Sequence, residues 1–281
     1  MNGAPELTTH ILIAALLTII LAGTGLGMKH RHRFSRQLTD DPGQRPRFYR
    51  DSIVGAWVLA AFVPLIAFES ADLSIADLGW AWPSGDGLDY LLAAYMLVMT
   101  LVGGLRARHR MRRGEMIPAR ARIAVIVPRT PHERRLAVAL AVTAGITEEA
   151  VYRGLLIAAG TQIYDLPLPL VAMASLALFV AAHAYQGRKG MVGIAALGAL
   201  FTIIYLVSGS LLLAIMVHVW QDLVALLLIP AHVGVPETTN GADTQPAAKT
   251  TGQAQDEPAA TTDGEPPQPA PRLVVRSAVP D

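Results

Sequence analysis

Six ionisable side chains stand out because they interrupt stretches of sequence that are otherwise apolar. They fall into three short clusters along the chain: Glu148, Glu149 and Arg153 in TEEAVYRG, His183 in LFVAAHAY, and His218 with Asp222 in MVHVWQD. Carboxylates and imidazoles are the side chains that most often transfer protons in enzymes. A charge near the centre of a bilayer costs about 2.5–3.5 kcal/mol, so such groups persist there only if they pair, take up protons or face a hydrated cavity.

Helical spacing gives the members of the first cluster different roles. Glu149 and Arg153 are four residues apart and share a helix face, so the guanidinium can neutralise this carboxylate within one helix. Glu148 lies about 100° away on the same turn. It shares its face with Tyr152, which is placed to donate a hydrogen bond to it. Glu148 is therefore the carboxylate that stays free to take up a proton.

The other two clusters repeat the four-residue spacing. His218 and Asp222 present an imidazole and a carboxylate on one face, and Phe179 and His183 are separated in the same way. Together the clusters offer one free carboxylate, two imidazoles that can position or donate, and an arginine that keeps the second carboxylate ionised. This set is suited to general acid–base chemistry.

The three clusters resemble the motifs of the CPBP family of intramembrane proteases, also called the Abi or CAAX-protease-and-bacteriocin-processing family. The family pattern is EExxxR, then FxxxH, then HxxxN or HxxxD, on separate membrane helices. Here the motifs read Glu148 to Arg153, Phe179 to His183 and His218 to Asp222, in the same order. One such motif alone is weak, whereas three in order on expected membrane helices are specific. The resemblance covers about residues 134–230.

The resemblance implies that a water molecule hydrolyses a peptide bond of a membrane-associated protein or peptide. By match, Glu148 and His183 hold and activate the water, while His218 and Asp222 occupy the positions of an oxyanion stabiliser. A carboxylate cannot donate to an oxyanion unless it is protonated, so we expect Asp222 to orient His218 or to bind a metal. Arg153 is then structural and holds Glu149 and its helix in register.

A metal ion is an open alternative for this chemistry. The HExxH signature of soluble zinc proteases is missing, yet Glu148, His183 and His218 could form a two-histidine, one-carboxylate site for a divalent ion such as zinc. The interpretation favoured by the sequence is water activation that requires no cofactor. A serine mechanism is disfavoured because no GxSxG motif occurs.

Seven apolar stretches are candidates for the membrane helices that carry these residues. Each approaches the roughly 20 residues that cross a bilayer at about 1.5 Å per residue. They cover residues 8–28, 52–68, 88–105, 136–159, 167–185, 190–207 and 210–230. The last two are separated only by Ser208 and Gly209, which indicates a helical hairpin.

The depths of two site residues do not match in this scheme. Measured from the ends of straight spans, Glu148 lies near mid-membrane and His183 lies roughly 12 Å nearer the cytoplasm. Unequal tilts would remove the gap, as would a fifth helix that starts later, after Pro167 and Pro169.

Basic residues predict the orientation. Of the 23 Lys and Arg, 19 lie in the connections 29–50, 106–135 and 188–189, whereas the alternate connections 69–87, 160–166 and 208–209 hold none. Lys and Arg mark cytoplasmic loops, so we expect the N-terminus outside and the C-terminus inside. The same asymmetry suggests a bacterial plasma membrane.

The chain divides into three parts on this basis. Residues 1–133 form an N-terminal segment of three membrane helices with basic cytoplasmic loops, and residues 134–230 form a catalytic core of four. Residues 231–281 are rich in Pro, Thr, Ala and Gln, and such a segment buries too little apolar surface to fold. We expect an all-α polytopic membrane protein with a disordered cytoplasmic tail.

Composition excludes several other classes of protein. The hydrophobic share of 52% and the charged share of 16% leave too little polar surface for a soluble globule. A net charge of +1 argues against a nucleic-acid partner, and the absence of cysteine removes disulfides and a thiol nucleophile. Two alternatives to a protease stay open, a proton-coupled membrane transporter and a catalytically silent membrane scaffold. The first is disfavoured because the sequence shows no inverted repeat.

Overall fold

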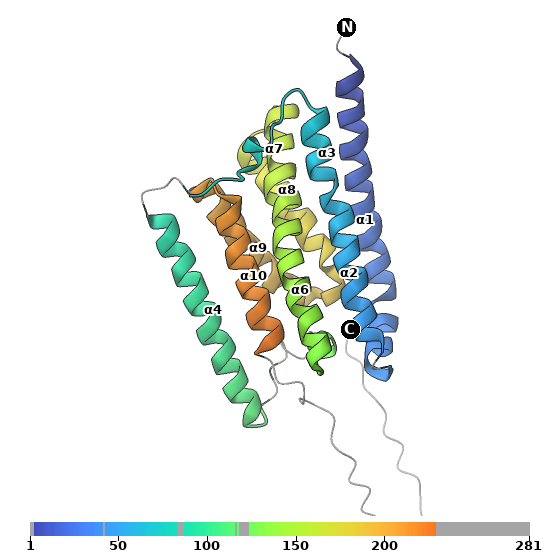
Figure 1. The fold of residues 1–281 in the computed structure, drawn as a ribbon, viewed down its shortest axis with the longest axis vertical. Helices are drawn as coiled ribbons and strands as arrows, with labels where there is room; N and C mark the ends of the chain where they lie inside the picture. Colours follow the sequence, from blue (N-terminus) through green and yellow to red (C-terminus); the bar gives the residue numbers. More distant parts are fainter. Residues whose placement is uncertain (1–2, 42, 84–86, 116, 118–123, 229–281) are drawn as a thin grey trace, which may run out of the picture. The chain divides into compact units, whose positions relative to one another are not determined.

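The computed structural model of this chain describes residues 3–41, 43–83, 87–115, 117 and 124–228, and throughout these ranges the regular elements are helices. The all-α fold is thus confirmed, while the expected tail at 231–281 lies outside the described residues. The main helices run side by side (Figure 1). They are α1 (Gly3–Asp40), α2 (Gln44–Ala60), α3 (Phe62–Glu69), α4 (Leu88–Arg112), α6 (Pro131–Glu148), α8 (Leu168–Ala182), α9 (Arg188–Ser208) and α10 (Leu211–Leu227).

The helices identify a membrane protein. Four segments within the described part of the chain are long and apolar enough to cross a bilayer: Leu7–His30, Gln44–Glu69, Leu88–Arg112 and Arg188–Ser208. The helices Leu168–Ala182 and Leu211–Leu227 are apolar but shorter. Each of the seven apolar stretches found in the sequence lies on a helical segment of the structure.

Several helices are longer than the apolar stretches that predicted them. Helix α1 continues to Asp40 through the basic segment, α2 begins at Gln44, and α4 continues to Arg112. Much of the expected loop 29–50 is therefore helical. The reason is that Lys and Arg have good helix propensity, so a helix does not have to end where its hydrophobic part ends.

Pro64 divides the second apolar stretch into two helices. Proline has no N–H for the carbonyl four residues earlier and its ring clashes with it, which here affects Ala60. Helix α2 ends at Ala60, and α3 starts again at Phe62.

The EExxxR motif lies in the middle of one long helical column. Helix α6 begins at a capping box, in which the Thr130 hydroxyl accepts from the Glu133 amide and the Glu133 carboxylate accepts from the Thr130 amide. The column continues as a π-helix at Glu149–Leu155, α7 at Leu156–Ala158 and a second π-helix at Ala159–Ile163. The expected span 136–159 is therefore too short, and part of it is π-helical rather than α-helical.

The length of this helical column removes the mismatch in depth between Glu148 and His183. Pro131 to Ile163 is about 48 Å at 1.5 Å per residue, and Glu148 lies about 25 Å along it. Helix α8 returns from the far end, starting directly after Pro167, and reaches His183 after about 23 Å. Both residues consequently lie near the middle of the bundle.

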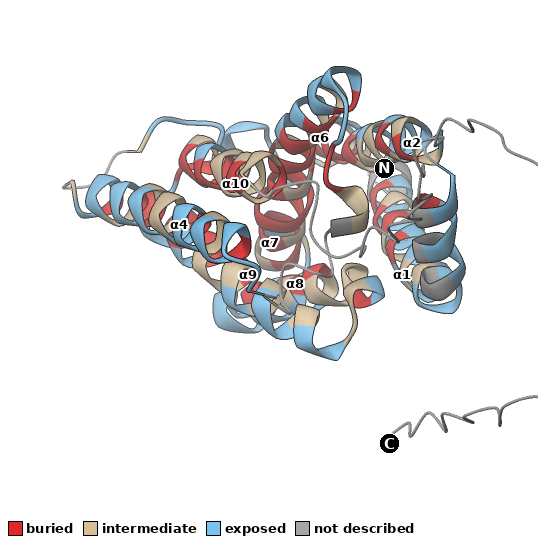
Figure 2. Ribbon diagram, turned by 90° about the horizontal axis from the view of Figure 1, so that it is seen from below, coloured by how far each residue is buried: buried red, intermediate tan, exposed pale blue. Residues whose placement is uncertain are grey.

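The column through α6 and α7 is the most buried part of the fold. Figure 2 shows buried residues concentrated there, whereas α4 and the outer sides of α1 and α9 are largely exposed. Gly145 lets α6 approach α10 closely, because a Cβ at this position would come within 2.4 Å of Val219 Cγ2.

The predicted hairpin between the last two helices is confirmed. Helix α9 ends at Ser208, Gly209 adopts the left-handed conformation with φ of 62°, and the Ser210 hydroxyl caps α10. A segment after α3 covers this turn. The Ser210 hydroxyl donates to the Ala81 carbonyl at 2.6 Å, and the Leu211 amide donates to the Gly79 carbonyl at 2.8 Å.

Candidate active site

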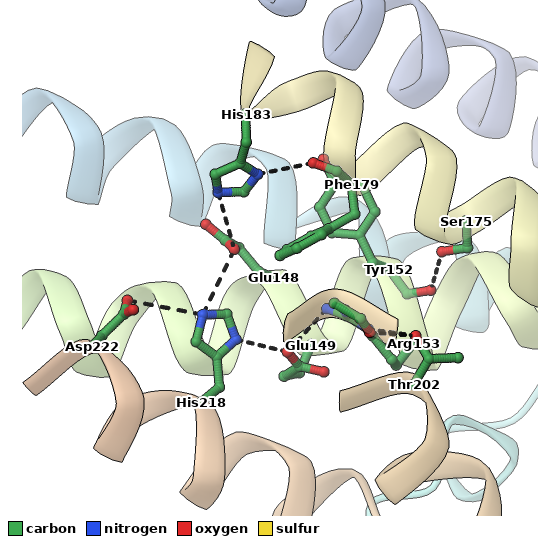
Figure 3. A network of polar contacts seen from close by, with 11 residues as sticks. Glu148, Glu149, Tyr152, Arg153, Ser175, Phe179, His183, Thr202, His218 and Asp222 are labelled. Atoms are coloured by element: carbon green, nitrogen blue, oxygen red, sulfur yellow. Dashed lines mark hydrogen bonds and ion pairs between the residues drawn. The ribbon is translucent and has the colours of Figure 1, made fainter. Parts of the chain in front are cut away.

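Glu148 lies between two imidazoles that come from different helices (Figure 3). Its Oε2 is 3.9 Å from Nε2 of His183, at the end of α8, and 3.9 Å from Nε2 of His218, on α10. These separations exceed a direct hydrogen bond, so the carboxylate oxygen is available to a third group. The side chain of Glu148 is 27% exposed and that of His183 is 16% exposed, so both can reach solvent or substrate.

Each imidazole is fixed through its other nitrogen. His183 Nδ1 lies 2.8 Å from the carbonyl oxygen of Phe179, and His218 Nδ1 lies 2.6 Å from Oε1 of Glu149. A carbonyl and an ionised carboxylate can only accept, so Nδ1 carries the proton in both rings. Each ring therefore directs Nε2 at Glu148.

Glu149 and Arg153 form a fully buried ion pair beside this centre. Arg153 Nη1 donates to Glu149 Oε1 at 3.0 Å, and the two side chains are 1% and 0% exposed. The guanidinium also stacks on the ring of Phe179, with its carbon 4.4 Å from the ring centroid. The pair fixes the Glu149 carboxylate in the position where it contacts His218.

Arg153 also connects the motif to α9, which the sequence analysis did not include in the site. Its Nη2 donates to the Gly198 carbonyl at 2.9 Å, and its Nε donates to the Thr202 hydroxyl at 3.3 Å. Phe201, on the same helix, stacks against the His218 ring with centroids 4.7 Å apart. In the sequence, Thr202 is one hydroxyl group in an apolar helix and Phe201 one of its apolar residues, so neither indicates a contact with the site.

Tyr152 and Asp222 complete the predicted set. Asp222 Oδ2 lies 3.8 Å from Nε2 of His218, and the side chain is 33% exposed, so it borders the same space as Glu148. Tyr152 packs edge-on against Phe179, and its carbonyl accepts from the Ser175 hydroxyl. Within the described residues its hydroxyl makes no hydrogen bond to Glu148, in contrast to the expectation from helical spacing.

The donor set does not have the spacing of a metal site. Two ligands of a tetrahedral zinc, each about 2.0–2.1 Å from the ion, lie about 3.4 Å apart. Glu148 is 3.9 Å from each imidazole, and no group of three or more His, Asp or Glu in the described part of the chain is arranged to hold a metal ion.

Comparison with known protein families finds a match for part of the chain. Residues 131–224 match the family model described as type II CAAX prenyl endopeptidase Rce1-like. The matched segment starts at the first residue of α6 and ends within α10, so it contains all three motifs. No curated protein and no solved structure matches the chain.

Proposed function

The chain carries a domain of the CPBP, or CAAX protease, family, and from this premise we propose that it is an intramembrane endopeptidase in which Glu148 and His183 activate the attacking water. The observation that carries the proposal is the position of Glu148 Oε2, 3.9 Å from the Nε2 atoms of both histidines. A water molecule bound there donates one O–H to Glu148 and the other to the lone pair of His183 Nε2.

The reaction then proceeds by proton transfer through Glu148. Glu148 accepts a proton as the water oxygen bonds to the carbonyl carbon of the scissile peptide. The carbonyl oxygen becomes an oxyanion, and His218 donates to it from Nε2 when the ring carries both protons. The proton held by Glu148 passes to the leaving nitrogen as the C–N bond breaks, which yields a carboxylic acid and an amine.

The remaining site residues keep His218 in place during these steps. Glu149 accepts from Nδ1 and fixes the plane of the ring, Arg153 holds Glu149, and Phe201 covers one face of the imidazole. Asp222 faces Nε2 from the exposed side and orients the ring. This division assigns the activation of water to Glu148 and His183, which solvent can reach, and the positioning of His218 to its four neighbours.

The proposal includes the membrane arrangement. We place seven crossings with the N-terminus outside, the C-terminus in the cytoplasm and the protein in a bacterial plasma membrane. In support, α1, α4 and α10 end at the same end of the bundle at which α2 and α6 begin (Figure 1). The connections at that end are the ones rich in Lys and Arg.

The direct test is cleavage by purified protein in lipid vesicles. The substrate is a pool of fluorescence-quenched peptides, each anchored in the vesicle by a transmembrane segment. We expect Glu148→Ala and His183→Ala to lose at least about 100-fold in activity while they remain folded. His109→Ala, which alters an exposed histidine of α4, is the matched control.

Two outcomes would contradict the proposal. Folded Glu148→Ala and His183→Ala variants that cleave as fast as the wild type would show that the catalytic assignment is wrong. Loss of activity with a strong chelator, restored by added zinc, would show that the reaction depends on a metal.

A further inference from the structure

Helix α4 lies outside the segment that matches the protease family, yet it makes two side-chain hydrogen bonds to the helix of the third motif. The indole Nε1 of Trp220 donates to the carbonyl of Leu97 at 3.0 Å. The hydroxyl of Thr100 donates to Oε1 of Gln221 at 3.1 Å. Trp220 and Gln221 are the two residues that directly precede Asp222 in the motif.

These bonds act on sides of α10 other than the one that carries His218 and Asp222. At about 100° per residue, Trp220 lies roughly 200° around the helix from His218, on its far side, while Gln221 lies about 60° to one side of His218 and Asp222 about 40° to the other. Contacts on two sides of the helix resist its rotation about its axis. Such a rotation would move His218 and Asp222 together.

Close backbone packing on two sides supports the same conclusion. A Cβ on Gly104 of α4 would come within 2.5 Å of Val224 Cγ1, so α4 approaches α10 one turn beyond the hydrogen bonds. On another side, α6 approaches at Gly145, where a Cβ would lie 2.4 Å from Val219 Cγ2. Helix α10 is thus held between α6, which carries Glu148, and α4.

The exposure of α4 is consistent with this role. Ala93, Met96 and Gly104 are buried within the bundle, while the opposite face presents large apolar side chains to the surroundings. Figure 2 shows α4 at the edge of the bundle, beside α9 and α10. Of the four α-helices that the structure describes before residue 131, α4 is the one that side-chain hydrogen bonds join to α10.

From this arrangement we infer that Thr100, Trp220 and Gln221 are positioning residues for catalysis. They set the rotation of α10, and with it the distance between His218 Nε2 and Glu148 Oε2. The inference rests on the proposed protease function. It adds that the N-terminal part of the chain is required for the geometry of the catalytic centre and not only for insertion into the membrane.

The test uses the full chain in vesicles with the same quenched peptides. Thr100→Val removes the donor at nearly constant volume, and Thr100→Ser keeps it. We expect kcat of Thr100→Val to fall about 5- to 20-fold with KM within about twofold, because small displacements of catalytic groups lower rates strongly. Thr100→Ser should remain within about twofold of the wild type.

A second variant tests the other hydrogen bond. Trp220→Phe keeps an aromatic ring but loses the N–H, and we expect a similar fall in kcat. The matched controls are Trp57→Phe, an exposed tryptophan of α2, and Thr18→Val, whose hydroxyl bonds only within α1. The folded fraction of every variant is measured by thermal unfolding at the assay temperature.

The outcomes separate this inference from the proposed function. If Glu148→Ala is inactive but Thr100→Val and Trp220→Phe keep the wild-type kcat, α4 does not position the site and the protease assignment stands. The inference also fails if kcat falls only in proportion to the folded fraction. A wild type no more active than Glu148→Ala overturns the proposed function and, with it, this inference.

Discussion

At the scale of single residues, Glu149 accepts two charge-assisted hydrogen bonds through one oxygen. Oε1 accepts from Arg153 and from His218, while Oε2 is buried and has no hydrogen-bond partner among the described residues. Removing one member of a buried pair leaves an uncompensated charge, whereas replacing both can be nearly neutral. The contribution of Glu149 to stability and the positioning role proposed for it can therefore be separated by mutation.

We predict that Arg153→Met lowers the free energy of unfolding by about 3–5 kcal/mol, because it leaves Glu149 charged and unpaired. The double variant Glu149→Gln with Arg153→Met should recover most of this stability. Despite this recovered stability, the double variant should cleave more slowly than the wild type, since His218 then lacks its charged acceptor. Unfolding in detergent and kcat are measured on all three proteins. A double variant with wild-type kcat would show that Glu149 does not orient His218.

Asp222 gives a second prediction at this scale. Asp222→Asn preserves size and can still accept from His218, so we expect activity within about tenfold of the wild type. Asp222→Leu removes the polar group that lies 3.8 Å from His218 Nε2 and should lower kcat further, by about 100-fold. The two variants are compared by kcat per folded protein. Equal losses in both variants would mean that the negative charge itself is required.

The sequence predicted which residues meet but not all of their partners. Spacing of four residues correctly paired Glu149 with Arg153, because that contact lies within one helix. Glu149 and His218 are 69 positions apart in the sequence and lie on different helical elements. Their contact requires that these elements pack closely, as they do at Gly145. Neither propensity nor periodicity reports such packing, so Thr202 and Phe201 were missed for the same reason.

At the scale of elements, α6 and α10 approach each other closely at one glycine, Gly145. We predict that Gly145→Ala lowers the free energy of unfolding by about 1–3 kcal/mol and reduces kcat at least tenfold, because the added Cβ meets Val219 and pushes the helices apart. Gly103→Ala is the control, since nothing lies within 4 Å of its added Cβ. A Gly145→Ala protein as active as the control would show that the packing is not needed for catalysis.

The segment 70–83, which covers the turn between α9 and α10, contains a carboxylate whose protonation should change the segment's local stability. The hydroxyl and amide of Ser74 both donate to Asp77, and these hydrogen bonds hold the pKa of Asp77 below its ordinary value of 3.8. A lowered pKa in the folded state stabilises the segment fully above the unfolded value, and the contribution is lost as pH falls through the folded value.

We therefore expect hydrogen–deuterium exchange in residues 70–83 to accelerate only below about pH 4, beyond the intrinsic effect of pH. Asp77→Ala should exchange faster at neutral pH and lack the acid transition. Asp72→Ala, which alters a neighbouring exposed carboxylate, should behave as the wild type. A wild-type transition that persists in Asp77→Ala would assign the acid dependence to another group.

Element boundaries show where local sequence information ends. The hairpin at Ser208–Ser210 and the break at Pro64 follow from the turn and backbone chemistry of the residues themselves. The extension of α1 to Asp40 and the π-helices around Glu149 do not, because hydropathy reports what the bilayer covers and not where a helix stops. The error in depth between Glu148 and His183 came from the same source.

At the scale of the whole molecule, the absence of cysteine makes the proposed orientation directly testable. We predict that Asp72→Cys reacts with a membrane-impermeant maleimide in intact cells, whereas Glu115→Cys reacts only after the cells are permeabilised. Both positions are exposed in the structure. The reverse pattern would show that the N-terminus faces the cytoplasm.

The hydrogen bonds that join Ser210 and Leu211 to the 79–81 segment have a consequence for the cell. Leu78 of this segment is 1% exposed and lies against Gly154, the residue that follows Arg153 of the buried ion pair. A protease that keeps water at mid-membrane lies in a barrier that also maintains an electrical potential. The proposed function therefore predicts that water reaches Glu148 from one end of the bundle only, since these backbone and buried apolar contacts lie at the other. Such an enzyme would hydrolyse peptides without opening a path for protons across the membrane.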